Sequence, residues 1–338
     1  MGRTQGKNTE TISMVAMEQE FKINQKKAMT GRIVFHIGPG KTGTTYLQNN
    51  IFNKLSRINN IGRPIHNTKR YRNFQDAILR DEEPFFLEKG YEFRNEVIQS
   101  RQNYPVTLVS DENLFSKTPI SANIRRLKDL FPEAEIIITV RNQLTAIQSF
   151  YLSGGYFLKG VPCADDFNRK RQISFNEYFD FSAKYLGKSY WTRYKYKNVL
   201  KTLEHYFSKN SIHILIFEEM TKQPDLFSKS LSTILDVPSD EILMLMQKST
   251  KLNARQSAVS MKYKKLRTLI PIKSISRSLP GSRFIIQHIE KLISKSTKGA
   301  SYAYSDKQIE KVSEIFRDDN RYLIDEYGIN VEQFGYPT

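Results

Sequence analysis

Short apolar runs alternate along the chain with longer stretches in which apolar residues recur every three or four positions. Helical spacing of this kind is clear in residues 122–131 and 196–207. The apolar runs have the length of buried strands and span residues 33–37, 106–109, 135–140 and 213–217. Buried strands that alternate with helices are typical of a parallel sheet covered on both faces. The pattern therefore predicts an α/β fold in which helices flank a parallel sheet.

The end of the chain has the pattern of one amphipathic helix. Ser305 followed by Gln308 is the signature of a capping box, and Gly328 is a signal for the end of a helix. The apolar residues between these two signals fall on one stripe and are Ile309, Val312, Ile315, Phe316, Leu323 and Ile324. We expect this helix to dock on the domain and to carry no chemistry.

Two segments stand outside the alternating pattern. Residues 1–30 are polar and lack periodicity, so we expect a mobile tail before a single domain over residues 31–338. Residues 251–300 contain twelve Lys or Arg and one acidic residue, and so carry +11 of the net charge of +17. We expect this segment to form a basic helical subdomain that covers a cofactor or holds an anionic acceptor. The alternative is a solvated basic face without a binding role.

Composition narrows the class of protein. The 338 residues include a single cysteine, Cys163, which excludes an intramolecular disulfide framework and a cysteine-based zinc site. No apolar run reaches the roughly 18 residues of a membrane span, and the start of the chain lacks the apolar core of a signal peptide. We therefore expect a cytoplasmic protein. The excess of 52 Lys and Arg over 35 Asp and Glu favours a polyanionic partner.

A glycine-rich segment, GPGKTGTT at residues 38–45, lies between the first predicted strand and a helix. The free backbone N–H groups and the dipole of a helix start favour an anion, and glycines let the backbone approach a phosphate. Lys41 adds a positive charge, and Thr44 and Thr45 add hydroxyl groups. A Walker A loop would place glycine at position 35, where this chain has Phe35, and here the lysine precedes Gly43 and the two threonines.

This order of residues resembles the 5′-phosphosulfate loop of the sulfotransferases that use 3′-phosphoadenosine 5′-phosphosulfate (PAPS). The family pattern is Pro-x-Lys-[Ser/Thr]-Gly-Thr-[Ser/Thr]. It is filled by Pro39, Lys41, Thr42, Gly43, Thr44 and Thr45. The resemblance implies that these residues, together with Gly40, bind the cofactor. It also implies that Lys41 neutralises the bridging oxygen as the sulfuryl group leaves, a charge that grows in the transition state.

A second motif of the same family follows the strand at 135–140. Arg141, Ser149 and Tyr151 stand at the family's spacing, and in the family this Arg and Ser bind the 3′-phosphate of the cofactor. Many members have Pro where this chain has Gln143. Arg141 also lies where a parallel strand ends, which is the usual ligand crevice. The last part of the chain is similar to bacterial members as well, so the resemblance covers about residues 32–338 and implies a P-loop-like fold.

Sulfuryl transfer to a hydroxyl group requires a base near the cofactor. The second strand ends in VSDENLF, which places Asp111 and Glu112 beside the first strand, and bacterial members often carry a Glu here. We expect Glu112 to be the base. Asp111 and His66 are the alternatives, and Asp111 also fits a helix cap. His36, inside the first strand, is expected to be a core residue, and no pair of His residues has metal-ligand spacing, so no metal is expected.

The resemblance implies transfer of a sulfuryl group from PAPS to a hydroxyl of an acceptor, which releases adenosine 3′,5′-bisphosphate. A bacterial enzyme that sulfates a capsular, exopolysaccharide or lipid-linked glycan fits best, and residues 258–295 are suited to contact with the inner membrane surface. Two other functions stay open. One is a nucleotide kinase that uses ATP and Mg²⁺, and the other is a non-enzymatic glycan- or nucleic-acid-binding protein. No RNA-binding aromatic motif or Cys/His finger supports nucleic acid.

Overall fold

The computed structural model describes residues 31–62, 69–79, 83–100, 104–116, 119–154, 173–249 and 302–338. The tail 1–30, the candidate base His66 and the basic segment 251–300 lie outside the described residues. The expectations about them therefore stay predictions. Within the described ranges, no helix combines the length and the apolar character needed to cross a membrane.

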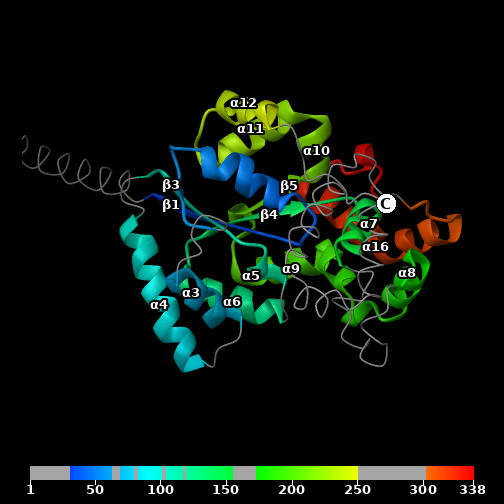
Figure 1. The fold of residues 1–338 in the computed structure, drawn as a ribbon, viewed down its shortest axis with the longest axis horizontal. Coiled ribbons are helices and arrows are strands. Elements are labelled where there is room, and N and C mark those ends of the chain that lie inside the picture. The colour runs from blue at the N-terminus through cyan, green and yellow to red at the C-terminus, as the bar shows by residue number, and fades with distance from the viewer. Residues whose placement is uncertain are drawn as a thin grey trace, which may run out of the picture.

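Five parallel strands form one sheet in the order β2-β3-β1-β4-β5. They are β1 (Arg32–Ile37), β2 (Asn59–Asn60), β3 (Val106–Ser110), β4 (Glu135–Val140) and β5 (Ile212–Ile216). Four of them correspond to the predicted strands, and β2 is a very short edge strand. Because β1 lies between β3 and β4, the segments that follow these three strands meet at one edge of the sheet (Figure 1). The predicted α/β fold with a parallel sheet is confirmed.

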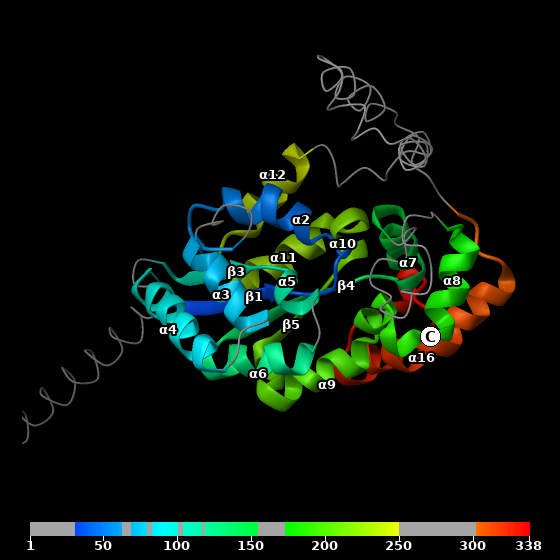
Figure 2. The same cartoon turned by 60° about the horizontal axis from the view of Figure 1, so that its bottom comes forward.

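Helices cover both faces of this sheet. One face carries α3 (Lys69–Leu79), α4 (Glu83–Ser100), α5 (Asn113–Ser116), α6 (Ile120–Leu130) and α9 (Tyr196–Tyr206). The other face carries α11 (Pro224–Leu235), α12 (Ser239–Lys248) and the helix that starts with α2 (Thr44–Tyr46) (Figure 1). At one end of the molecule lie α7 (Gln143–Ser153), α8 (Phe175–Lys184) and α16 (Asp306–Tyr327), which are together in both views (Figures 1 and 2).

The sheet divides the described core into two hydrophobic clusters. Successive residues of β4 alternate between them, with Ile136 and Ile138 in the larger cluster and Ile137 in the smaller one. All three side chains are fully buried. A strand that is buried on both faces has apolar residues at every position. This is why the strands could be recognised in the sequence as continuous apolar runs.

The predicted carboxyl-terminal helix is α16. The side chain of Ser305 accepts a hydrogen bond from the backbone N–H of Gln308, and the reciprocal bond of the capping box is also present. Gly328 ends the helix with a φ of 65°, in the left-handed region that favours glycine. Of the predicted stripe, Val312, Phe316 and Leu323 are fully buried, but Ile309 in the first turn is 41% exposed. The stripe was therefore predicted one residue too long at its start.

Candidate cofactor-binding and catalytic site

The glycine-rich loop begins where β1 ends and turns the chain into the helix that starts at Thr44. Lys41 has a φ of 75° and Gly43 a φ of 92°, so two residues of the loop are in the left-handed region. This backbone conformation is costly for Lys41, and such strain is concentrated at functional sites. The hydroxyl of Thr42 donates to the carbonyl oxygen of Pro39 at 2.8 Å and closes the loop from inside. The loop therefore presents its backbone and the first helical N–H groups at the edge where β1 ends.

At two glycines of the loop, neighbouring side chains leave little room for a Cβ atom. A Cβ atom on Gly43 would lie 2.8 Å from the methyl carbon of Met220 and 2.9 Å from the ring of Phe217. Both neighbours belong to α10 (Phe217–Lys222), the helix that follows β5. A Cβ atom on Gly40 would lie 2.9 Å from the hydroxyl of Tyr190. Helix α10 and the segment around Tyr190 thus fix the position of the loop.

Arg141 follows β4 directly and reaches the loop from the neighbouring strand. Its Nη1 atom donates to the carbonyl oxygen of Lys41 at 2.7 Å, and its Nε atom donates to the hydroxyl of Thr145 at 2.9 Å. The centre of the guanidinium group lies 4.1 Å from the ring centroid of Phe217. The structure thus brings together the two sequence motifs that contain Lys41 and Arg141. A guanidinium group has five N–H donors, so these contacts are compatible with a bidentate contact to a phosphate.

Ser149 lies on α7, one helical turn after Thr145, and is half-buried. Residues four apart share a helix face, so Ser149 is on the face of α7 that contacts Arg141. The next residue, Phe150, stacks on Tyr190 with ring centroids 4.1 Å apart. Arg141 thus lies just before α7 and Ser149 lies within this helix.

The departure from the family pattern at Gln143 has a structural explanation. Gln143 is fully buried, and its amide group exchanges two hydrogen bonds with Asn320 of α16, at 2.7 and 3.1 Å. A proline at this position could not form these bonds. Gln143 therefore fixes the start of α7 to the carboxyl-terminal helix.

A chain of buried hydrogen bonds lies under the loop and joins three strands. Nε2 of Gln48 donates to the hydroxyl of Ser110 at 3.1 Å, and Ser110 contacts Nδ1 of His36 at 2.8 Å. Nε2 of His36 contacts the hydroxyl of Thr139 at 3.2 Å. Burial lowers the pKa of His36 to about 3, so the ring is neutral at physiological pH. The expectation that His36 is a core residue agrees with these contacts.

Asp111 and Glu112 form the turn after β3, next to the start of the loop. The carboxylate of Asp111 is fully buried and accepts hydrogen bonds from the hydroxyl of Tyr71 at 2.7 Å, from the amide of Gln75 and from the backbone N–H of Asn113 at 2.9 Å. These contacts fit the cap interpretation of Asp111. Glu112 in the same turn is half-buried. Of the two candidate bases that the structure describes, Glu112 is the less buried residue, although its Oε2 atom is buried.

Sequence reasoning missed a buried carboxyl group beside Arg141. One oxygen of Glu218 accepts from the backbone N–H of Asn142 at 3.1 Å, and the other accepts from the hydroxyl of Tyr336 at 2.8 Å. Burial raises the pKa of Glu218, and burial followed by the charge of Glu218 raises the pKa of Glu219. The only sequence signal was the acidic end of the run HILIFEEM, because Tyr336 and Asn142 are far from it in the chain.

The arrangement fits a nucleotide that carries an anionic group at each end. The loop with Lys41 would hold one end, and Arg141 with Ser149 would hold the other. The partners of the Arg141 side chain named above are a carbonyl, a hydroxyl and an aromatic ring. These groups orient the guanidinium group beside the loop. Among the described residues, no group of three His, Cys, Asp or Glu side chains is placed to hold a metal ion.

The comparison with protein families agrees with this site. The model of the family described as "Sulfotransferase domain" matches residues 32–320, which contain the loop, Glu112 and Arg141. The chain therefore belongs to the sulfotransferase domain family and is an enzyme of sulfuryl transfer. No curated protein matches the chain significantly.

Three solved structures show what the chain is similar to. A sulfotransferase from Alicyclobacillus acidocaldarius is 15% identical with a TM-score of 0.50, over 89% of this chain and 97% of that chain. The mouse sulfotransferase SULT7A1 complexed with PAP is 13% identical with a TM-score of 0.45, over 91% and 89%. The sulfotransferase domain from the curacin biosynthetic pathway is 15% identical with a TM-score of 0.43, over 84% and 97%. At these identities, the first structure supports the fold alone.

Proposed function

We propose that this sulfotransferase uses PAPS as donor and transfers its sulfuryl group to a hydroxyl of a glycan acceptor. The observation that carries the proposal is the 2.7 Å contact between Nη1 of Arg141 and the carbonyl oxygen of Lys41. It joins a strand–loop–helix phosphate site and a second cation at one edge of the sheet. A cofactor with a 3′-phosphate and a 5′-phosphosulfate has its charges at two ends, as this arrangement requires. An ATP-type site would need only the loop and a metal ion.

Several residues of the loop would bind the 5′-phosphosulfate end of the cofactor. The backbone N–H groups of Thr42 and Gly43 and the hydroxyl groups of Thr44 and Thr45 would bind the phosphosulfate. Pro39 and Gly40 would act by shaping the loop around it, because Pro39 has no backbone N–H and that of Gly40 donates to Tyr190. Arg141 and Ser149 would bind the 3′-phosphate. When bound, PAPS supplies an activated sulfuryl group. The ammonium group of Lys41 would stabilise the negative charge that grows on the bridging oxygen, an effect typically worth a factor of about 10²–10³ in turnover.

Glu112 would accept the proton of the acceptor hydroxyl. Its turn is tied to β1, because the backbone N–H of Asp111 donates to the carbonyl oxygen of His36 at 3.0 Å. This bond fixes the turn next to the place where the loop leaves β1. Asp111 is a weaker candidate because three hydrogen bonds occupy its carboxylate, and His66 remains a candidate outside the described residues.

The proposal of a glycan acceptor is based on the charge of residues 251–300. A net charge of +11 on residues 251–300 suits an anionic glycan or a lipid-linked glycan at a membrane surface, with contact through residues 258–295 in a cytoplasmic enzyme. Residues 31–338 would form one domain, and residues 1–30 would form a tail. An acceptor whose KM rises with salt would support it, since exposed charges are screened over about 8 Å at physiological ionic strength.

The donor is tested by binding and transfer. Adenosine 3′,5′-bisphosphate should raise the Tm of the protein more than ADP does, and sulfur-labelled PAPS should label glycans in an acceptor screen. Lys41→Met should lose most of the transfer. Its matched control is Lys54→Met, which should leave transfer unchanged. Lys54 is an exposed lysine at the end of the 3₁₀ helix η2 (Phe52–Lys54), in the helical segment that follows the loop. Tighter binding of ATP with Mg²⁺ than of the bisphosphate would contradict the proposal and favour a kinase.

A further inference from the structure

Three tyrosine hydroxyl groups from one short segment contact the two halves of the site. The segment comprises the 3₁₀ helix η7 (Tyr190–Tyr194) and the first residue of α9, Tyr196. At the loop, the backbone N–H of Gly40 donates to the hydroxyl of Tyr190 at 2.7 Å, and the hydroxyl of Tyr194 donates to the carbonyl oxygen of Gly40 at 3.1 Å. Gly40 is thus held at both its N–H and its carbonyl group.

Tyr196 holds Arg141 in the same way with one hydroxyl group. The backbone N–H of Arg141 donates to this hydroxyl at 2.9 Å, and the hydroxyl donates to the carbonyl oxygen of Arg141 at 2.6 Å. Both polar backbone groups of Arg141 therefore have a single partner in common. Rotation of the backbone at this residue would break two hydrogen bonds at once.

The segment that carries these hydroxyl groups is firmly anchored. Trp191, Tyr194 and Tyr196 are fully buried, and the indole N–H of Trp191 donates to the hydroxyl of Tyr178 at 3.2 Å. Burial raises the pKa of Tyr194 and of Tyr196 well above the usual value, so both hydroxyl groups keep their protons and remain donors. A rigid support of this kind is what preorganises a binding site.

We propose that Tyr194 and Tyr196 are positioning residues for the two ends of the cofactor, Tyr194 for the phosphosulfate loop and Tyr196 for Arg141. The inference rests on the proposed function, because it takes Arg141 as the ligand of the 3′-phosphate. Neither tyrosine needs to touch the cofactor. Tyr194 fixes the backbone of the loop that would hold the phosphosulfate, and Tyr196 fixes the backbone of Arg141, whose side chain would bind the 3′-phosphate. The two residues should therefore act on different ends.

The test compares three nucleotides on conservative variants. Binding of adenosine 3′,5′-bisphosphate, adenosine 5′-monophosphate and adenosine 3′-monophosphate is measured by calorimetry, with competition for the weak ligands. Tyr196→Phe should weaken the bisphosphate and the 3′-monophosphate about tenfold, and should leave the 5′-monophosphate nearly unchanged. Tyr194→Phe should weaken the bisphosphate and the 5′-monophosphate by roughly three- to tenfold, and should spare the 3′-monophosphate.

Tyr178→Phe is the matched control, because it removes a buried hydroxyl that contacts Trp191 in the same segment. It should lower the Tm without changing any ratio of affinities. If Tyr194→Phe and Tyr196→Phe behave like this control, the inference is overturned while the proposed function stands. If the wild-type protein does not prefer the bisphosphate, the proposed function fails and the inference falls with it. Should Tyr196→Phe not fold, Tyr190→Phe, at a half-buried hydroxyl, tests the Gly40 half.

Discussion

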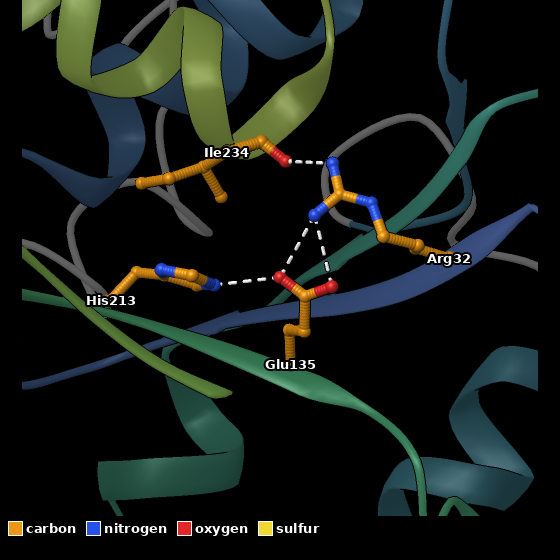
Figure 3. Close-up of polar contacts among 4 residues, drawn as sticks. All are labelled: Arg32, Glu135, His213 and Ile234. Atoms are coloured by element: carbon orange, nitrogen blue, oxygen red, sulfur yellow. Dashed lines mark hydrogen bonds and ion pairs between the residues drawn. The ribbon is translucent and has the colours of Figure 1, made fainter. Parts of the chain in front are cut away.

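Charged residues have different roles at the two edges of the sheet, namely the edge where the strands begin and the edge where they end. At the edge where the strands begin, Arg32 of β1, Glu135 of β4 and His213 of β5 form one cluster (Figure 3). Arg32 contacts one oxygen of Glu135 at 2.9 Å, and Nε2 of His213 contacts the other at 2.6 Å. Arg32 also donates to the carbonyl oxygen of Ile234 at 2.7 Å. Opposite charges here neutralise one another and tie three strands and α11 together.

At the edge where the strands end, the side chain of Arg141 contacts a carbonyl oxygen, a hydroxyl group and an aromatic ring. Burial alone would raise the pKa of Glu135, but the hydrogen bonds from His213 and Arg32 outweigh it and lower this pKa. Beside Arg141, in contrast, burial dominates and raises the pKa of Glu218. Paired charges thus tie the strands together at one edge, while at the other edge the side chain of Arg141 lies against the loop that contains Lys41. Substitutions at the two edges should therefore have separable effects.

The largest effect is expected at the proposed base. Glu112→Gln should lower kcat by roughly 10²–10⁴, because general-base catalysis is lost while the shape of the side chain is kept. The affinity for adenosine 3′,5′-bisphosphate and the Tm should stay close to wild type. Steady-state rates with an acceptor from the labelled screen provide the measurement. Unchanged turnover would move the assignment to Asp111 or His66, and a loss of folding alone would show that Glu112 only supports the turn.

Next in size is a change in the loop itself. Gly43→Ala should lower the affinity for the bisphosphate at least tenfold and destabilise the fold by about 1–3 kcal/mol. A Cβ atom would meet Met220 and Phe217 within 3 Å, at a φ of 92°. Gly187→Ala is the matched control, since nothing lies within 4 Å of its Cβ position, and it should change neither quantity. Calorimetry and urea unfolding measure the two effects. Normal binding by Gly43→Ala would show that the loop does not hold the 5′ end.

Because His36 is buried and its pKa is lowered, we expect the stability of the protein to fall in acid. Its folded pKa of about 3 is lower than the unfolded value of about 6.5, so the unfolded chain binds a proton that the native protein does not. Stability should therefore fall as the pH drops from about 6.5 toward 3, with a slope of up to about 1.4 kcal/mol per pH unit. Urea unfolding of the wild type and of His36→Gln at pH 5 to 7.5 should show a slope difference of this sign. Parallel curves would contradict it.

The smallest effect is expected at the opposite edge. Glu135→Gln should destabilise the protein by about 1–2 kcal/mol and leave nucleotide affinity unchanged, because its charged hydrogen bonds are partly buried and far from the loop. As the pKa of Glu135 is lowered on folding, its contribution is present above the unfolded pKa and is lost as the pH falls through the folded pKa. Glu326→Gln removes an exposed pair with Lys209 and should change the Tm little. A change in nucleotide affinity for Glu135→Gln would show that the two edges are coupled.

Some parts of the site could be predicted from the sequence, and others could not. The strands, the loop and Arg141 depend on local order, because each motif directly follows an apolar strand and the parallel register brings the strand ends together. The hydroxyl groups that support the site depend on contacts between distant segments. Tyr190 is 150 positions from Gly40, and Tyr336 is 118 positions from Glu218. No local pattern of hydrophobic or charged residues reports such a contact, and β2 was too short for any period.

The central claim is that Arg141 recognises a 3′-phosphate while the loop holds the other end. The most direct measurement is the ratio of the affinities for adenosine 3′,5′-bisphosphate and adenosine 5′-monophosphate, by calorimetry, in wild type, Arg141→Ala and Arg32→Ala. The wild type should prefer the bisphosphate by roughly 10- to 100-fold, the worth of a charge-assisted contact. Arg32→Ala, at the other edge, should lose stability and keep this ratio. Arg141→Ala should bind both nucleotides about equally; if it keeps the wild-type preference, another residue binds the 3′-phosphate and the account of the site is wrong.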